Sequence, residues 1–255
     1  MNDVEAHQLA AWTMLLSGIP VFIALLFLSA PYGRYSRGGW GPLINAKIAW
    51  FTQEVPSLLV AGAILASSGV PTFTTHPASL RTALAVMFLA HYVYRSLVYP
   101  FRMKSGNHTP LSIWAMSFVF CIWNGFLQGY FIAYQLPHAA PVSTQAAIGL
   151  LIQAVGWLNV MYADTILLNL RKPGETGYQI PYGGMFTLVS AGNYASEIIE
   201  WAGYALAAGG ALPAAAFAFF VFCNLAPRGW QHHQWYQKKF SNYPANRKAV
   251  IPFIW

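Results

Sequence analysis

The chain has 255 residues, of which 56% are hydrophobic and only 8% are charged. An average soluble domain carries about 25% charged residues, so this composition excludes a soluble globular domain, and its apolar, aromatic character excludes intrinsic disorder. Two cysteines are too few for a disulfide scaffold, and the formal net charge of +7 is typical of the basic cytoplasmic loops of a membrane protein, with no nucleic-acid partner expected.

Long apolar runs follow one another along the whole chain. A membrane-spanning helix needs roughly 20 apolar residues, and we predict seven such helices, which make an all-α integral membrane protein with a single domain, residues 1–255. The last two runs join through the small residues 207–211, so no polar break marks their boundary. In chain order the predicted spans are Leu9–Ala30, Ile48–Ser68, Thr82–Tyr99, Leu111–Tyr134, Gln145–Leu168, Gly184–Leu206 and Ala207–Leu225.

The basic residues favour alternate loops. Lys and Arg follow the first, third, fifth and seventh predicted spans, whereas Arg81 alone lies near the second loop and the fourth and sixth loops have none. Because cytoplasmic loops carry an excess of Lys and Arg, this alternation predicts an N-terminus outside and a C-terminus in the cytoplasm. The longest cytoplasmic pieces are then the loop Arg171–Gly183 and the tail Pro227–Trp255.

Four acidic residues fall within or at the ends of apolar runs: Glu54, Asp164, Glu197 and Glu200. A carboxylate at the centre of a bilayer costs roughly 2.5–3.5 kcal/mol on insertion scales, so such groups usually face the interior of the helix bundle and mark a site. Glu54 has no Lys or Arg near it in sequence. We therefore expect burial to favour its neutral form, which can donate a hydrogen bond to a carbonyl oxygen.

Polar side chains also recur at helical spacing, so that single helix faces carry several of them. Arginine, asparagine, histidine and tyrosine on such faces suit a phosphate-bearing ligand that is rich in hydrogen-bonding groups. Trp and Tyr near the ends of the spans are interpreted as anchors at the membrane interface. The striped groups are Tyr92, Arg95 and Tyr99; Asp164 and Arg171; Asn193, Glu197 and Glu200; and Arg228, His232 and Tyr236.

The common soluble motifs are missing from the sequence. Neither the glycine-rich dinucleotide-binding pattern nor the P-loop pattern occurs. His232 and His233 are the only adjacent histidines and the other five are scattered. We therefore expect no metal site.

Several segments together resemble the steroid 5α-reductase family, the 3-oxo-5-alpha-steroid 4-dehydrogenases, over about residues 30–255. The resemblance is most specific in the second half of the chain. The segments that carry it are Leu170–Glu175, Tyr178–Phe186, Val189–Tyr194, Glu197–Trp201 and Tyr243–Trp255, with Tyr32–Arg34, Gln53–Ser57, His91–Tyr92 with Arg95, and Asn124–Tyr130 before them.

This resemblance implies a seven-helix membrane reductase that uses NADPH and passes a hydride to C5 of a 3-oxo-Δ4-steroid. The steroid would enter from the bilayer and the cofactor site would face the cytoplasm, in a bacterial inner membrane or an endoplasmic reticulum membrane. Glu54 and Tyr92 would hold the C3 carbonyl, with Gln53 beside them. The implied cofactor positions, concentrated in residues 159–255, are Asp164, Arg171, Asn193, Arg228, His232 and Tyr236, supported by Tyr178 and Glu197 and joined by Tyr32, Arg34 and Tyr99.

The chain departs from the family pattern at one position. Relatives have an asparagine four residues before the aspartate, where this chain has Val160, and its own Asn159 lies about 100° further round the helix. Either the helix is locally adjusted or this cofactor contact is missing. Arg102 and Lys104 are further phosphate partners by charge alone.

Three other functions remain open from the residues themselves. A trans-2-enoyl-CoA reductase would reduce a similar conjugated unit on an acyl thioester. An isoprenylcysteine-type methyltransferase would bind S-adenosylmethionine in a similar membrane core. A lipid or sterol binder, or a transporter, would use the polar stripes without chemistry, although no pair of broken helices in matching halves favours a transporter.

Overall fold

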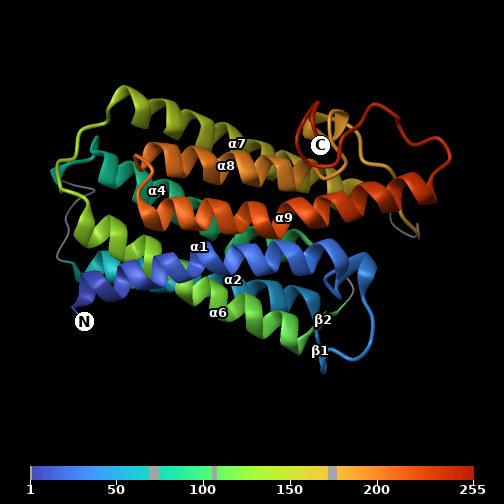
Figure 1. Ribbon diagram of the computed structural model, residues 1–255, viewed down its shortest axis with the longest axis horizontal. Helices are drawn as coiled ribbons and strands as arrows, with labels where there is room; N and C mark the ends of the chain where they lie inside the picture. Colours follow the sequence, from blue (N-terminus) through green and yellow to red (C-terminus); the bar gives the residue numbers. More distant parts are fainter. Residues whose placement is uncertain (1, 69–74, 105–107, 172–176) are drawn as a thin grey trace.

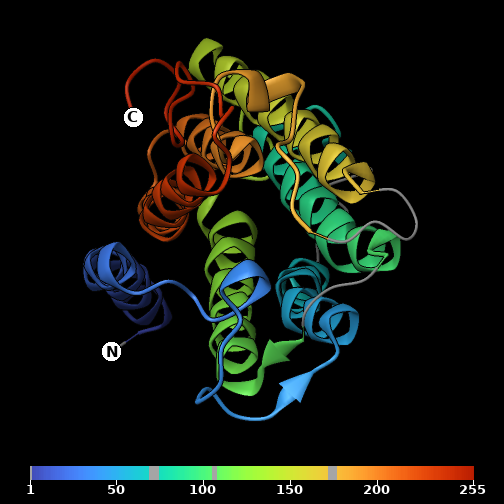
Figure 2. The same cartoon turned by 90° about the vertical axis from the view of Figure 1, so that its right-hand side faces the viewer.

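The computed structural model describes residues 2–68, 75–104, 108–171 and 177–255. Its helices run back and forth along one long axis, with the N-terminus at one end of the bundle and the C-terminus towards the other (Figure 1). The end that carries residues 28–45, the segment before Gly192 and the last fifteen or so residues is called the C-terminal end below, and the opposite end is called the N-terminal end. Figure 2 looks onto the C-terminal end.

The secondary structure is almost entirely helical. Two short strands, β1 (Leu43–Ile44) and β2 (Thr109–Pro110), pair antiparallel with Leu43 opposite Pro110. Short turns are η1 (Gly33–Tyr35) and η4 (Gly184–Thr187), and two π-helical turns are η2 (Tyr94–Val98) and η3 (Phe131–Gln135). The α-helices are α1 (Asp3–Phe27), α2 (Ala46–Ser67), α4 (Leu80–Val93), α5 (Tyr99–Arg102), α6 (Leu111–Tyr130), α7 (Thr144–Asn169), α8 (Gly192–Ala207) and α9 (Leu212–Lys239).

Local sequence explains where several helices begin. The Asn2 side chain accepts a hydrogen bond from the backbone N–H of Glu5, and the backbone N–H of Asn2 donates one to the Glu5 carboxylate, which together form a capping box at the start of α1. Asn45, Ser79 and Ser143 cap α2, α4 and α7 in the same way with their side-chain oxygens. These caps satisfy backbone N–H groups that would otherwise be unpaired.

Five of the described helices are long and apolar enough to cross a membrane: Asp3–Phe27, Ala46–Ser67, Leu111–Gln135, Thr144–Asn169 and Leu212–Lys239. They coincide with five of the seven predicted spans and confirm a helical membrane protein. The predicted span Thr82–Tyr99 is occupied by α4, η2 and α5, and the predicted span Gly184–Leu206 by the shorter α8. Length and composition alone therefore do not establish these two as spans.

Two predicted boundaries are wrong. The sixth span was expected to begin at Gly184, but α8 begins at Gly192, because residues 184–187 form the short turn η4 and Val189 pairs with Lys248 in an isolated β-bridge. The last span was expected to end at Leu225, but α9 continues through Pro227 to Lys239. Hydropathy locates the end of the apolar run, and here the helix continues beyond the end of that run.

The helices pack most extensively as three pairs, α7 with α8, α2 with α6, and α1 with α9. Glycines allow the closest approaches: a Cβ added at Gly129 would lie 2.8 Å from Cα of Ala61, and one at Gly156 would lie 2.6 Å from Cα of Glu200. A buried apolar core that includes Phe88, Trp201 and Phe217 joins the pairs. The contact at Gly156 places the backbone of Glu200 directly against α7.

Candidate active site

Glu54 and Tyr92 converge between three helices. The carboxyl group of Glu54 on α2 and the phenol of Tyr92 on α4 are close enough to interact electrostatically. Asn124 on α6 donates a hydrogen bond of 2.9 Å from Nδ2 to the Tyr92 hydroxyl oxygen. The thiol of Cys121 lies 3.9 Å from Oε2 of Glu54. We call this group, Glu54, Ser57, Tyr92, Cys121 and Asn124, the inner cluster.

Contacts of Ser57 and of Gln53, which is adjacent to Glu54, help to hold the inner cluster in place. Ser57 donates a hydrogen bond of 2.8 Å to the backbone oxygen of Cys121 and also lies beside the Tyr92 hydroxyl. Gln53 is buried beside Glu54, its neighbour in sequence on α2. The structure thus places Gln53, Glu54 and Tyr92, three residues separated by up to 39 positions in sequence, in one neighbourhood.

An ion pair lies next along the bundle. Nη1 of Arg95 is 3.5 Å from Oδ2 of Asp164, which also accepts a hydrogen bond of 3.2 Å from the Tyr94 hydroxyl. The Arg95 guanidinium covers the rings of Trp50 and Tyr99, at 4.7 and 5.2 Å from their centroids. Asp164 and Tyr99 were expected as cofactor residues, and both are held here by Arg95. The sequence placed Arg95 on the same helix face but assigned it no role.

A second group of side chains surrounds two arginines at the C-terminal end. Arg228 donates a hydrogen bond of 2.8 Å to the Tyr194 hydroxyl, and its guanidinium lies 5.0 Å from the centroid of Tyr32. Arg34 donates a hydrogen bond of 3.0 Å to the Tyr236 hydroxyl and covers the Tyr178 ring at 5.1 Å. We call this group the outer cluster; its members are Tyr32, Arg34, Tyr35, Tyr178, Tyr194, Arg228, His232 and Tyr236.

His232 connects the two sides of the outer cluster. Its Nδ1 lies 3.1 Å from the Tyr35 hydroxyl and its Nε2 lies 3.3 Å from the Tyr194 hydroxyl. Burial raises the pKa of Tyr35 to about 12, so this phenol keeps its proton at neutral pH. Tyr35 and Tyr194 were not among the expected site residues, and their hydroxyl contacts with His232 bring them into the outer cluster.

Several of these side chains lie deep among the helices and still keep part of their surface accessible. Glu54, Arg95, Tyr194 and Arg228 are neither fully buried nor exposed, although protein surrounds each of them. These four residues come from the inner cluster, the Arg95–Asp164 pair and the outer cluster, so each of the three groups keeps some accessible surface.

Three other expected positions contribute less directly. Arg171 is exposed just beyond the end of α7, beside residues 172–176, which lie outside the described residues. Asn193 and Glu197 are half-buried on α8, and Glu197 interacts electrostatically with Arg95 and Tyr194. Glu197 therefore joins the line of polar groups.

The departure at Asn159 is resolved by the geometry of α7. The helix is continuous through this region, Val160 is buried, and Nδ2 of Asn159 donates a hydrogen bond of 2.9 Å to the backbone oxygen of Val155. The helix is therefore not locally adjusted, and Asn159 bonds its own backbone. Arg102 and Lys104 similarly bond α7, through Thr165 at 2.7 Å and Asn169 at 3.2 Å.

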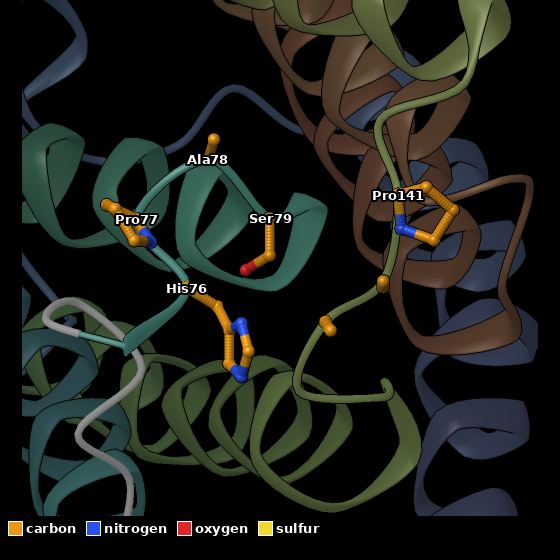
Figure 3. A pocket seen from close by; sticks show the side chains of 7 residues that line it. His76, Pro77, Ala78, Ser79 and Pro141 are labelled. Carbon is orange, nitrogen blue, oxygen red and sulfur yellow. The ribbon is translucent and has the colours of Figure 1, made fainter.

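A pocket at the N-terminal end contains none of the expected residues. It has a volume of about 250 Å³ and is lined by small and apolar side chains together with His76 and Ser79 (Figure 3). The Ser79 hydroxyl is engaged in capping α4. Among the described residues, no group of three or more His, Cys, Asp or Glu side chains could hold a metal ion.

Comparison with known proteins identifies the relatives of this chain. The family model of 3-oxo-5-alpha-steroid 4-dehydrogenase matches residues 107–255. The chain is 40% identical over 241 residues to 3-oxo-5-alpha-steroid 4-dehydrogenase 1 of Bos taurus, covering 93% of this chain and 92% of the relative. The chain belongs to the 3-oxo-5-alpha-steroid 4-dehydrogenase family.

Further members of the 3-oxo-5-alpha-steroid 4-dehydrogenase family are similar in sequence to this chain over most of its length. Form 1 of Homo sapiens is 41% identical over 239 residues, covering 93% of this chain and 91% of the relative. Form 2 of Sus scrofa is 43% identical over 235 residues, covering 90% of each. The family expected from the sequence is thereby confirmed: the chain is a membrane oxidoreductase of a family that acts on CH–CH bonds in steroid metabolism.

Proposed function

We propose that this protein reduces the Δ4 double bond of 3-oxo-Δ4-steroids to 5α-3-oxosteroids with NADPH, and that Glu54 and Tyr92 hold the C3 carbonyl oxygen. The observation that carries the proposal is the convergence of Glu54 and Tyr92 on neighbouring residues of α6, together with an arginine-rich outer cluster at the C-terminal end. Family membership supplies the reaction class.

The outer cluster fits a phosphate-bearing cofactor. Nη1 of Arg34 is buried and has no hydrogen-bond partner among the described residues. Arg34 and Arg228 donate to neutral groups, and no carboxylate within the described part of the chain forms an ion pair with either guanidinium. Guanidinium groups in this state match the oxygens of a phosphate.

The residues that would hold NADPH extend from the Arg95–Asp164 pair to the outer cluster. Glu197 on α8 interacts electrostatically with Arg95 and with Tyr194 of the outer cluster, and Asn193 directly precedes Tyr194 on the same helix. When bound, the cofactor supplies a hydride. The proposed set is Asp164, Arg171, Tyr178, Asn193, Glu197, Arg228, His232 and Tyr236, with Tyr32, Arg34 and Tyr99.

The inner cluster would stabilise the charge that develops on the substrate. Addition of a hydride at C5 of a conjugated ketone places negative charge on the C3 oxygen. Asn124 donates to the Tyr92 oxygen, so the phenol proton is free to point towards that carbonyl, and Glu54 in its neutral form donates a second hydrogen bond. One preorganised donor of this kind is worth roughly 10²–10³ in rate.

The proposed orientation follows from the two ends of the bundle. Of the basic residues, Arg81 lies near the start of α4 at the N-terminal end, whereas η1, α5 and the end of α9 carry Arg34, Arg102 and Lys238 at the other end. With seven passes, the N-terminus is outside and the outer cluster faces the cytoplasm, in a bacterial inner membrane or an endoplasmic reticulum membrane. The steroid enters laterally from the lipid.

Product analysis tests this function. Purified protein in lipid nanodiscs is incubated with NADPH and progesterone, and in a parallel reaction with NADPH and a trans-2-enoyl-CoA. A separate binding assay uses S-adenosylmethionine. We expect the 5α-dihydro steroid with equimolar NADPH oxidation. Reduction of the enoyl-CoA alone would point to an enoyl-CoA reductase, and binding of S-adenosylmethionine without NADPH to a methyltransferase; either result contradicts the proposal.

A further inference from the structure

A buried histidine–glutamate pair lies beside the inner cluster and has no role in the function proposed above. Nδ1 of His91 on α4 lies 2.7 Å from Oε1 of Glu200 on α8. The two side chains are 3% and 0% exposed. The His91 ring also packs edge-on against Tyr92, with the ring centroids 5.1 Å apart.

This contact must contain a proton, because neither an unprotonated ring nitrogen nor a carboxylate oxygen can donate a hydrogen bond. With one proton the pair has a net charge of −1 and Nε2 is an acceptor. With two protons the pair is neutral and Nε2 carries a hydrogen. Oε2 of Glu200 is buried without a hydrogen-bond partner among the described residues, and an unpaired buried charge is costly, which favours the neutral pair.

Charged and titratable groups face the pair from every neighbouring helix. His91 interacts electrostatically with Glu54 of α2, Arg95 of η2 and Glu197 of α8. Asp164 of α7 interacts with Arg95, and Cys121 of α6 interacts with Glu54. Of the groups that interact electrostatically with His91, Glu54 is the one that the proposed function uses as a proton donor.

We propose that the His91–Glu200 pair returns a proton to Glu54 after each reduction. The inference rests on the proposed function. As the C5–H bond forms, Glu54 gives its proton to the C3 oxygen and becomes a carboxylate. His91 and Glu54 make no direct hydrogen bond or ion pair, so Nε2 of His91 gives its hydrogen to Glu54 through an intervening water molecule, and a proton on Glu200 moves to Nδ1.

The protons gained and lost in this series of transfers balance. The pair passes from neutral to a net charge of −1 and is restored by one proton from water. The enol becomes the ketone when its hydroxyl proton leaves to water and water supplies one at C4. One hydride and one proton are consumed in each turnover. His91 and Glu200 act through Glu54 and do not touch the substrate, so they are positioning residues that also store a proton.

The pH dependence of turnover separates proton supply from a purely structural role. The full-length protein in nanodiscs is assayed with NADPH and progesterone from pH 6 to 9, as wild type and as Glu200→Gln, which keeps the size of the side chain and can still bond Nδ1. We expect turnover of the variant to fall by roughly tenfold or more above pH 8. It should follow the proton concentration, because the proton must now come from solvent.

A second variant and a control complete the design. His91→Asn keeps an amide near the position of Nδ1 and should show the same altered profile. His138→Asn changes an exposed histidine at the N-terminal end, which contacts Arg81 at 3.0 Å, and should leave the profile unchanged. NADPH affinity and thermal unfolding show whether each variant is folded. If His91→Asn does not fold, the pH profile of Glu200→Gln alone tests the inference.

Two results overturn the inference. If the wild type reduces progesterone and Glu200→Gln keeps the wild-type pH profile, with any loss equal at every pH, the pair is structural. If the wild type reduces no steroid, the proposed function is wrong and this inference is wrong with it.

Discussion

The inner and outer clusters recognise different things with different chemistry. The inner cluster consists of a carboxyl group, hydroxyls, a thiol and an amide that contact one another across α2, α4 and α6. The outer cluster consists of guanidinium groups on aromatic rings at η1 and α9. The difference indicates that the inner cluster responds to charge that appears during reaction, whereas the outer cluster binds charge that the ligand already has.

The largest expected effect is a loss of turnover when a residue of the inner cluster is changed. Glu54→Gln and Tyr92→Phe each remove one proposed donor and should lower turnover by roughly 10²–10³, with NADPH affinity unchanged. Steady-state kinetics and cofactor binding measure the two quantities separately. Tyr134→Phe, at an exposed position of η3, is the matched control. Normal turnover in both variants would remove the proposed role of the inner cluster.

The outer cluster should show the opposite behaviour. Arg228→Ala removes charged hydrogen bonds to the cofactor, and we expect NADPH affinity to fall about 10- to 100-fold while turnover at saturating cofactor changes little. Titration of the cofactor by fluorescence measures the change, and Lys239→Ala, an exposed position at the end of α9, is the control. A loss of turnover with unchanged affinity would assign Arg228 to the chemistry.

A smaller effect tests how the inner cluster is held. Asn124→Ala removes the 2.9 Å hydrogen bond to Tyr92 and should lower turnover by about 3- to 10-fold. In a Tyr92→Phe background the same change should have almost no further effect, because the shared hydroxyl is already gone. Independent, multiplying losses would show that Asn124 does not act through Tyr92.

The smallest expected effect concerns Arg171. Because Arg171 is exposed beyond α7, its interaction with a phosphate is screened by water and salt. Arg171→Ala should weaken NADPH binding by less than about fivefold at low salt, and the difference should shrink as salt is raised. A salt-independent loss as large as that of Arg228→Ala would place Arg171 inside the binding site.

The sequence predicted the fold to the extent that hydropathy reports it. Apolar runs located five helices that can span a membrane, whereas hydropathy does not report the turn η4 and the bridge of Val189 to Lys248, which precede the start of α8 at Gly192. The predicted seventh span ended at Leu225, whereas α9 extends to Lys239, as the helical spacing of Arg228, His232 and Tyr236 indicated. Polar helical residues at the end of a bundle look like a tail when only apolar runs are counted.

The sequence predicted which helix faces carry the site but not which residues meet across helices. Spacing placed Arg95 on one face with Tyr92, yet its contacts with Trp50 and Asp164 join three separate helices. Arg228 and Tyr32 lie about 200 positions apart in the chain and meet only in the fold. Helical periodicity holds no information about the rotation of one helix relative to another.

A structure with NADP⁺ and a 3-oxo-Δ4-steroid bound tests the central claim most directly. The account predicts the C3 oxygen within hydrogen-bonding distance, about 2.5–3.0 Å, of both the Tyr92 hydroxyl and the Glu54 carboxyl group. It also predicts that the cofactor phosphates contact Arg34 and Arg228. A steroid whose C3 oxygen lies away from Glu54 and Tyr92 would contradict the account.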